Sequence, residues 1–149
     1  MKANELRIGN IVTHDDYSGE IFEVISILPN PDMRNSYMID TRGGKNGTWV
    51  NDISLVNPVP LTIKWLLKFG FIQDLEEDVS YYAYAENCPY DRIEFNYLRD
   101  CWVLRDNEGM YYEGPQYVHQ LQNLYFAMTG EELDIVKRPR QHVPGSTLN

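Results

Sequence analysis

The sequence has few of the residues from which catalytic and metal-binding sites are usually built. Its 149 residues include only two cysteines and three histidines. Cys88 and Cys101 have no companion Cys-x-x-Cys motif and no paired histidines, so a structural zinc site is not indicated. A chain of this length does not need a disulfide framework, and we therefore expect a reducing, cytoplasmic environment.

Long apolar runs are absent as well. The chain has no stretch of about eighteen consecutive apolar residues, and Glu5 and Arg7 stand where a signal peptide has its apolar segment. We expect neither a membrane span nor secretion. Eight prolines and ten glycines are too few for a low-complexity chain, whereas an apolar content of 43% is enough for a globular fold.

Basic residues are outnumbered by acidic ones. The chain has 13 Lys and Arg against 22 Asp and Glu, which gives a formal net charge of -9. An acidic surface repels a phosphate backbone, and this disfavours general nucleic-acid binding. Residues 137–149 differ, because they include Lys137, Arg138 and Arg140 and no acidic residue. We predict a flexible basic tail there, which either contacts an anionic partner or is simply solvated.

The first part of the chain, residues 1–57, is typical of a small β-barrel. Residues 20–28 are apolar at both odd and even positions, as expected for a strongly curved strand that contributes to two sheet halves. Turn-forming residues separate the apolar segments. We predict strands over residues 8–13, 20–28, 36–40, 48–50 and 54–56, in an order that resembles an SH3-like barrel.

A second part, residues 58–136, is predicted to be an α+β unit. Pro58 and Pro60 lack backbone N–H groups, so we expect them to end the preceding ladder. The elements predicted after them are a helix over residues 63–69, capped by Thr62 and ended by Gly70; strands over 79–85, 92–98, 101–105 and 110–113; a helix that opens at Gly114-Pro115 and stops at Thr129-Gly130; and a terminal strand over 131–136.

The strand predicted over residues 92–98 alternates in character. Ile93, Phe95 and Tyr97 share one face, which we expect the helices to cover, and Glu94 and Asn96 share a face that we expect to meet solvent. On the last helix an apolar stripe faces the core. The residues expected on its opposite side are Gln120, Gln122 and Asn123. The fold class is therefore α+β: a small SH3-like barrel, then an antiparallel meander packed with two helices.

Three segments together resemble a known family. They are residues 2–10, residues 118–133, and Pro60-Leu61-Thr62 with Trp65-Leu66-Leu67-Lys68-Phe69-Gly70-Phe71. The chain resembles a family of small uncharacterised proteins from Bacteroidetes genomes, often found in prophages and other mobile elements. The resemblance implies a cytoplasmic accessory protein of a mobile element. It implies no activity, cofactor or catalytic residue.

Residues that could carry chemistry form no recognised motif. His14 stands beside Asp15 and Asp16, but neighbours in sequence point apart, and a polar turn is favoured. Residues 43–47 lack the Gly-Lys-Ser/Thr ending of a phosphate-binding loop. The acidic run at 74–78 lacks the EF-hand spacing. His119 is assigned a capping or edge role on its helix. We predict no catalytic, cofactor-binding or metal-binding residue, and no enzyme.

Aromatic residues, in contrast, are abundant at 13% of the chain. Many lie between residues 81 and 125, and they are more than one covered sheet face is expected to hide. Tyrosine and tryptophan provide large, rigid contact areas, which protein interfaces use. We predict that Tyr81, Tyr90, Tyr111 and Tyr112 contact a protein partner; the alternative is that the aromatic residues build the core of the sheet and its edges.

The first functional expectation is a non-enzymatic interaction module that binds a protein partner, and a homo-oligomer is one form this could take. The alternative is a nucleic-acid-related role, in which the barrel or the tail contacts nucleic acid, or the acidic middle mimics DNA to occupy a host defence protein. A third hypothesis is an enzyme whose site combines His14, acidic residues and tyrosines across the cleft between the two parts.

Overall fold

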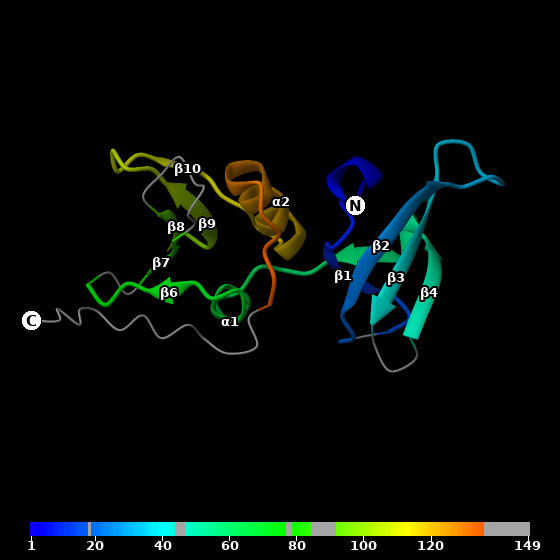
Figure 1. The fold of residues 1–149 in the computed structure, drawn as a ribbon, viewed down its shortest axis with the longest axis horizontal. Coiled ribbons are helices and arrows are strands. Elements are labelled where there is room, and N and C mark those ends of the chain that lie inside the picture. The colour runs from blue at the N-terminus through cyan, green and yellow to red at the C-terminus, as the bar shows by residue number, and fades with distance from the viewer. Residues whose placement is uncertain (18, 44–46, 77–78, 85–91, 136–149) are drawn as a thin grey trace, which may run out of the picture.

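The structure, a computed structural model, describes residues 1–17, 19–43, 47–76, 79–84 and 92–135. Figure 1 shows a five-stranded antiparallel sheet toward each end of the molecule, with helix α2 (Val118–Thr129) between them and helix α1 (Ile63–Lys68) beside the second sheet. The predicted α+β class is confirmed. In the described part of the chain, no helix is long and apolar enough to cross a membrane.

The first sheet is open. Its strands are β1 (Ile11–His14), β2 (Phe22–Pro29), β3 (Tyr37–Gly43), β4 (Gly47–Asp52) and β5 (Val56–Pro58), in the order β4-β3-β2-β1-β5. Among the described residues no pairing joins β4 to β5, so the closed barrel predicted for residues 1–57 is not found. Two short 3-10 turns, Ala3–Glu5 and Ile53–Leu55, flank the strands.

Strand β2 changes faces at a bulge. Its pairing with β3 shifts between Val24 and Ser26. Phe22 and Val24 before the bulge and Ile27 after it therefore pack into the same core cluster. The bulge moves the inward-facing side chains from even-numbered to odd-numbered positions, and this explains why the strand is apolar at both. The curved strand shared by two sheet halves, which the sequence suggested, is not required.

Pro58 does not end the ladder as expected. Strand β5 pairs with β1 so that Pro58 lies opposite Val12 and Asn57 lies opposite Thr13. The strand tolerates a proline because it is at the edge of the sheet, where a missing N–H can face away from the neighbouring strand.

The second sheet is the predicted antiparallel meander with one added strand. It contains β6 (Ile72–Gln73), β7 (Ser80–Ala83), β8 (Ile93–Leu98), β9 (Cys101–Arg105) and β10 (Tyr111–Glu113), in the order β10-β9-β8-β7-β6. Sequence reasoning missed β6, since two residues leave no periodic signal. No strand forms over residues 131–135, so the predicted terminal strand is wrong there. Residues 136–149, including the predicted tail, lie outside the described residues.

The helices cover one face of this second sheet. Trp65 and Leu66 of α1 and Leu121 of α2 pack in one buried cluster with Phe95 and Trp102 of the sheet. Helix α2 ends where the sequence predicts, because Gly130 takes a left-handed conformation with φ 75° and its N–H donates to the Phe126 carbonyl.

The polar side of α2 meets solvent only in part, because Gln120 is exposed whereas Gln122 is buried and Asn123 is half-buried. The Gln122 Oε1 accepts a hydrogen bond from the Ile11 N–H at 2.9 Å, and the Gln122 Nε2 donates to the Gly9 carbonyl at 3.0 Å. The Asn123 Oδ1 accepts a further hydrogen bond from the Asn10 Nδ2 at 3.0 Å. These amides join the helix to the start of β1, and through it to the first sheet.

Replacing the Gln122 amide should weaken the whole fold. We expect Gln122→Met to lower the free energy of unfolding by about 1–3 kcal/mol, because the buried Ile11 N–H loses its acceptor while the side-chain volume is nearly kept. Urea unfolding followed by far-ultraviolet circular dichroism measures the change. A midpoint equal to that of the wild type would show that the amide is not needed to hold the two sheets together.

Candidate functional site

The structure does not bring the sequence's chemical candidates together. The His14 side chain is buried, and its Nδ1 accepts the Asp16 N–H at 3.1 Å. Asp15 accepts a bond from Asn57 instead. Cys101 donates to the Leu98 carbonyl, and Cys88 lies outside the described residues. Within the described ranges, no three His, Cys, Asp or Glu side chains gather in a group that could hold a metal ion.

The four tyrosines predicted to contact a partner are placed differently from one another. Tyr81 must be corrected: it is 3% exposed and packs against Trp102 with ring centroids 5.9 Å apart, so it is part of the core. Tyr90 lies outside the described residues. Tyr111 and Tyr112 are adjacent on β10 and are 49% and 54% exposed. Of the three that the structure describes, Tyr111 and Tyr112 stay available to a partner.

Strand β10 is an edge strand, and some of its backbone N–H and C=O groups point away from the sheet. The Asp106 N–H donates to the Met110 carbonyl and the Gly114 N–H donates to the Trp102 carbonyl. Given the pairing of Tyr111 with Arg105 and of Glu113 with Val103, the backbone groups of Tyr111 and Glu113 point away from β9. Because β10 ends the sheet order in the described part of the chain, these groups face an edge that carries no further strand there.

The turn before β10 is held by one carboxylate. Asp106 Oδ1 accepts the Met110 N–H at 2.8 Å and the Glu108 N–H at 3.0 Å, and its Oδ2 accepts the Tyr112 hydroxyl at 3.0 Å. The Met110 N–H is the largest cause that lowers the pKa of Asp106. Gly109, at φ 81°, supplies the left-handed residue that the turn requires. The edge strand is therefore presented by a pre-organised hairpin.

A buried carboxylate occupies the sheet face opposite the helices. Glu94 and Asn96, which the sequence placed in solvent, are both buried, so that prediction is wrong. Glu94 Oε1 accepts from Ser80 at 3.0 Å and from Arg105 at 3.1 Å. Its Oε2 lies 2.7 Å from a guanidinium nitrogen of Arg92. Polar side chains from neighbouring strands cover these two residues and shield them from solvent. The alternation of polar and apolar residues along one strand cannot show this, because it contains no information about the neighbouring strands.

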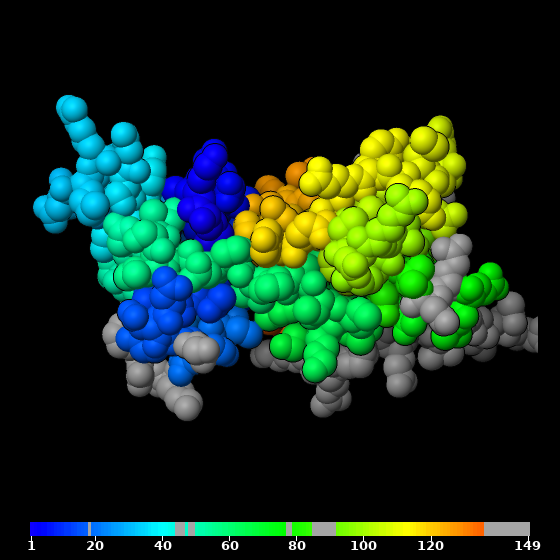
Figure 2. All heavy atoms as spheres, turned by 180° about the vertical axis from the view of Figure 1, so that it is seen from behind, coloured from blue at the N-terminus to red at the C-terminus, as the bar shows by residue number. Residues whose placement is uncertain are grey.

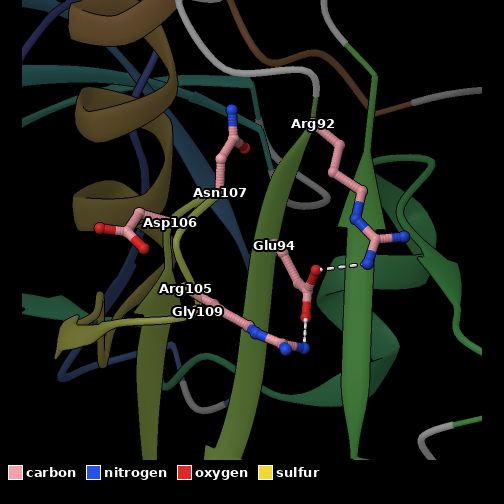
Figure 3. A pocket seen from close by; sticks show the side chains of 6 residues that line it. All are labelled: Arg92, Glu94, Arg105, Asp106, Asn107 and Gly109. Atoms are coloured by element: carbon pink, nitrogen blue, oxygen red, sulfur yellow. Dashed lines mark hydrogen bonds and ion pairs between the residues drawn. The ribbon is translucent and has the colours of Figure 1, made fainter.

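Glu94 is held in its charged form. Burial tends to raise the pKa of this carboxyl, but the hydrogen bonds from Asn96, Ser80 and Arg105, together with the charge of Arg92, outweigh it and lower the pKa. An ionised carboxylate with these donors around it is a poor general acid. Figure 3 shows the two guanidinium groups reaching Glu94, that of Arg92 from the residue just before β8 and that of Arg105 from β9, with Asp106 turned away from them.

Aromatic rings flank the two arginines. Strand register places Tyr82 beside Glu94, Glu94 beside Arg105, and Arg105 beside Tyr111 across four neighbouring strands. The Arg92 guanidinium lies 4.7 Å from the centre of the Tyr82 ring, and that of Arg105 lies 5.9 Å from the Tyr111 ring. We name these five residues the arginine row.

The cavity beside the arginine row is small. It has a volume of about 230 Å³ and is lined by Arg92, Glu94, Arg105, Asp106, Asn107 and Gly109. Ligand sites usually exceed about 300 Å³. The arginine row therefore packs along one face of the hairpin, and on β10 the side chains of Tyr111 and Tyr112 stay exposed. Sequence reasoning found Tyr111 and Tyr112 from their residue type, but it missed the supporting charges.

Comparison with known proteins adds no relative: no family model, curated protein or solved structure gives a significant match to this chain.

Removing the buried charge should destabilise the second sheet. We expect Glu94→Gln to lower the free energy of unfolding by about 1–3 kcal/mol, since two guanidinium groups lose their shared partner and a lowered pKa means that the charged form stabilises the fold. The matched control is Glu23→Gln, because Glu23 pairs with Arg42 on an exposed surface and should contribute less than about 1 kcal/mol.

The same pair of variants has a pH signature. Because the folded-state pKa of Glu94 lies below its ordinary value of 4.5, its stabilisation is present above that pH and is lost as the pH falls. Chemical unfolding at several pH values should show the wild type and the Glu94→Gln variant converging in acid. Equal stability of the two at neutral pH would contradict the role given to Glu94.

His119 should make the fold sensitive to mild acid. Its side chain is buried on α2, and neither ring nitrogen has a hydrogen-bond partner among the described residues. Burial is the largest cause that lowers its pKa below 6.5, so the unfolded chain binds the proton more readily and stability falls as the pH drops below that value. His119→Phe keeps a ring that can stack on Tyr117. We expect the melting temperature of this variant, measured relative to that of the wild type, to be higher at pH 5.5 than at pH 7.5. A pH-independent difference would contradict this assignment.

Proposed function

We propose that the protein is a non-enzymatic interaction module that binds a polypeptide partner at the β10 edge. The observation that carries the proposal is the open edge itself, where the N–H and C=O groups of Tyr111 and Glu113 point away from β9. An extended partner segment can add to such an edge as a further strand, with main-chain hydrogen bonds providing affinity.

The side chains of β10 suit this role. Tyr111 lies on the face of the arginine row and Tyr112 on the helix-covered face, so an added strand would meet one exposed ring on each side of the sheet. The preceding Met110 is exposed too. Figure 2 shows the hairpin, coloured yellow, at the opposite end of the molecule from the loop between β2 and β3, coloured cyan. A partner has access from outside.

Edge strands usually carry a device that blocks pairing, such as a proline, a lysine or a short length. Strand β10 is short, with three residues, but contains neither proline nor lysine. A short strand provides few backbone hydrogen bonds, and for this reason the tyrosine contacts must contribute to affinity and specificity. Tyrosine is enriched among residues that dominate binding energies.

The proposal extends to the partner and to the cellular role. The partner is another protein or a second copy of the chain, and the protein acts in the cytoplasm as an accessory protein of a mobile element, as the family resemblance implies. An SH3-like relationship for the first sheet is likewise a proposal. The nucleic-acid-related alternative stays a prediction, which titration of the chain with duplex DNA at two salt concentrations tests.

Glu113→Pro tests the edge directly. The Glu113 N–H points away from β9, so proline removes a donor for an added strand without removing a bond within the hairpin. Glu113→Ala is the matched control, because it removes the same side chain and keeps the N–H. We expect immobilised wild type and Glu113→Ala to retain the same binding proteins from the native host lysate, and Glu113→Pro to retain at least fivefold less of them.

Analytical ultracentrifugation of wild type, Glu113→Ala and Glu113→Pro tests whether the partner is a second copy of the chain. If the partner is a second copy, wild type and Glu113→Ala should self-associate and Glu113→Pro should be monomeric. The far-ultraviolet circular dichroism spectrum checks that the hairpin variant is folded. The proposal fails if wild type is a strict monomer that retains no partner, or if Glu113→Pro binds as well as Glu113→Ala.

A further inference from the structure

A second candidate surface lies away from β10, where the first sheet meets the segment that follows α2. A cleft of about 490 Å³ opens there, within the size range of about 300–1,000 Å³ that is usual for ligand sites. The cavities beside the arginine row and at the start of α2, of about 230 and 290 Å³, fall below that range. This cleft is therefore the roomier of the three.

The cleft has an apolar floor and an apolar rim. Its floor includes the buried side chains of Ile11, Phe22 and Leu133. Two exposed isoleucines on its rim, Ile8 and Ile21, come from the first part of the chain, and a third, Ile135, follows α2. Each exposed isoleucine on its own is ordinary, but three from separate segments around one hollow form a surface that burial against another molecule would stabilise.

The charges at the cleft are mostly negative. Three acidic residues line it, against Arg42 as the single basic one in the lining. Glu23 is paired with Arg42 at 2.9 Å, and Glu132 is paired with Arg7 at 2.7 Å. Asp134 forms no ion pair with any residue in the described ranges. A ligand group placed beside Asp134 is therefore favoured if it is cationic.

The polar wall of the cleft does not suit a small molecule. The Gln122 amide has both ends occupied by Ile11 and Gly9. Sites for small ligands need polar groups that converge on the ligand and fix its orientation. An open apolar hollow with a negative rim fits a side chain that is already positioned by its own backbone.

We propose that this cleft binds a polypeptide segment that presents a large apolar side chain next to Lys or Arg. The apolar side chain fills the hollow between Ile8, Ile21 and Ile135, and the cationic group lies at Asp134. The proposal is independent of the β10 edge, and each can fail while the other holds.

The test uses the full chain labelled with ¹³C at the isoleucine δ1 methyl groups. Two synthetic probes share an apolar centre and differ in charge: acetyl-Lys-Leu-Leu-Lys-amide and acetyl-Glu-Leu-Leu-Glu-amide. We expect the basic peptide to shift the methyl signals of Ile8, Ile21 and Ile135 saturably with a dissociation constant of about 1 mM or tighter. The buried Ile93 in the second sheet should not respond, and the acidic peptide should bind at least tenfold more weakly.

Variants separate the two parts of the recognition. Ile21→Ser should lower the affinity for the basic peptide at least fivefold. Because Ile21 is exposed, the substitution leaves the core unchanged. Asp134→Asn should lower the affinity for the basic peptide about threefold, as expected for the loss of an exposed ion pair. Asp100→Asn is the matched control for charge, since Asp100 is exposed in the β8–β9 turn, and it should have no effect.

Three results would overturn the proposal. They are no saturable shift with the basic peptide, equal binding of the two peptides, and shifts at Ile93 in place of the rim isoleucines. Glu113→Pro should bind the basic peptide as the wild type does, so a failure at β10 leaves this measurement unaffected.

Discussion

The Gln122 amide is the contact on which the arrangement of the two sheets depends. One end accepts the Ile11 N–H and the other donates to the Gly9 carbonyl, as a neighbouring strand would do. Strand β1 thereby gains a partner on α2, whose other side is packed in the core of the second sheet. Ile11 itself belongs to that second core, so polar and apolar contacts join the two halves at the same place.

A comparable polar contact supports the candidate site. Glu94 of β8 binds Ser80 of β7, Arg105 of β9 and Arg92, which directly precedes β8, and this connects β9 to the centre of the sheet. The β10 hairpin extends from this support and is stiffened by Asp106. An interaction edge that is already ordered loses less conformational entropy on binding than a flexible one does. The buried charges thus lie on the face of the sheet that carries Tyr111, whereas Tyr112 lies on the other face.

Local patterns predicted most of the elements. Strand β9 has the bounds that the sequence indicated, and α2 stops at Gly130 because glycine takes the left-handed conformation there. The site was predictable only in part. Tyr111 and Tyr112 follow from residue type, whereas Tyr81 has the same type and lies in the core, because its strand position faces the helices. The cluster around Glu94 gave no pattern, since Ser80 and Arg105 meet Glu94 from neighbouring strands that are apart in sequence.

The amino-acid sequence by itself determined the α+β class, the meander of the second sheet and the helix that follows it, because periodicity, prolines and glycines act over a few residues. Only the tertiary structure decided that the first sheet stays open, that β2 changes faces between Val24 and Ser26, and that Gln122 and Glu94 are buried. Each of these depends on what an element packs against. A polar residue is buried when distant segments supply its partners, and that supply is a property of the folded chain.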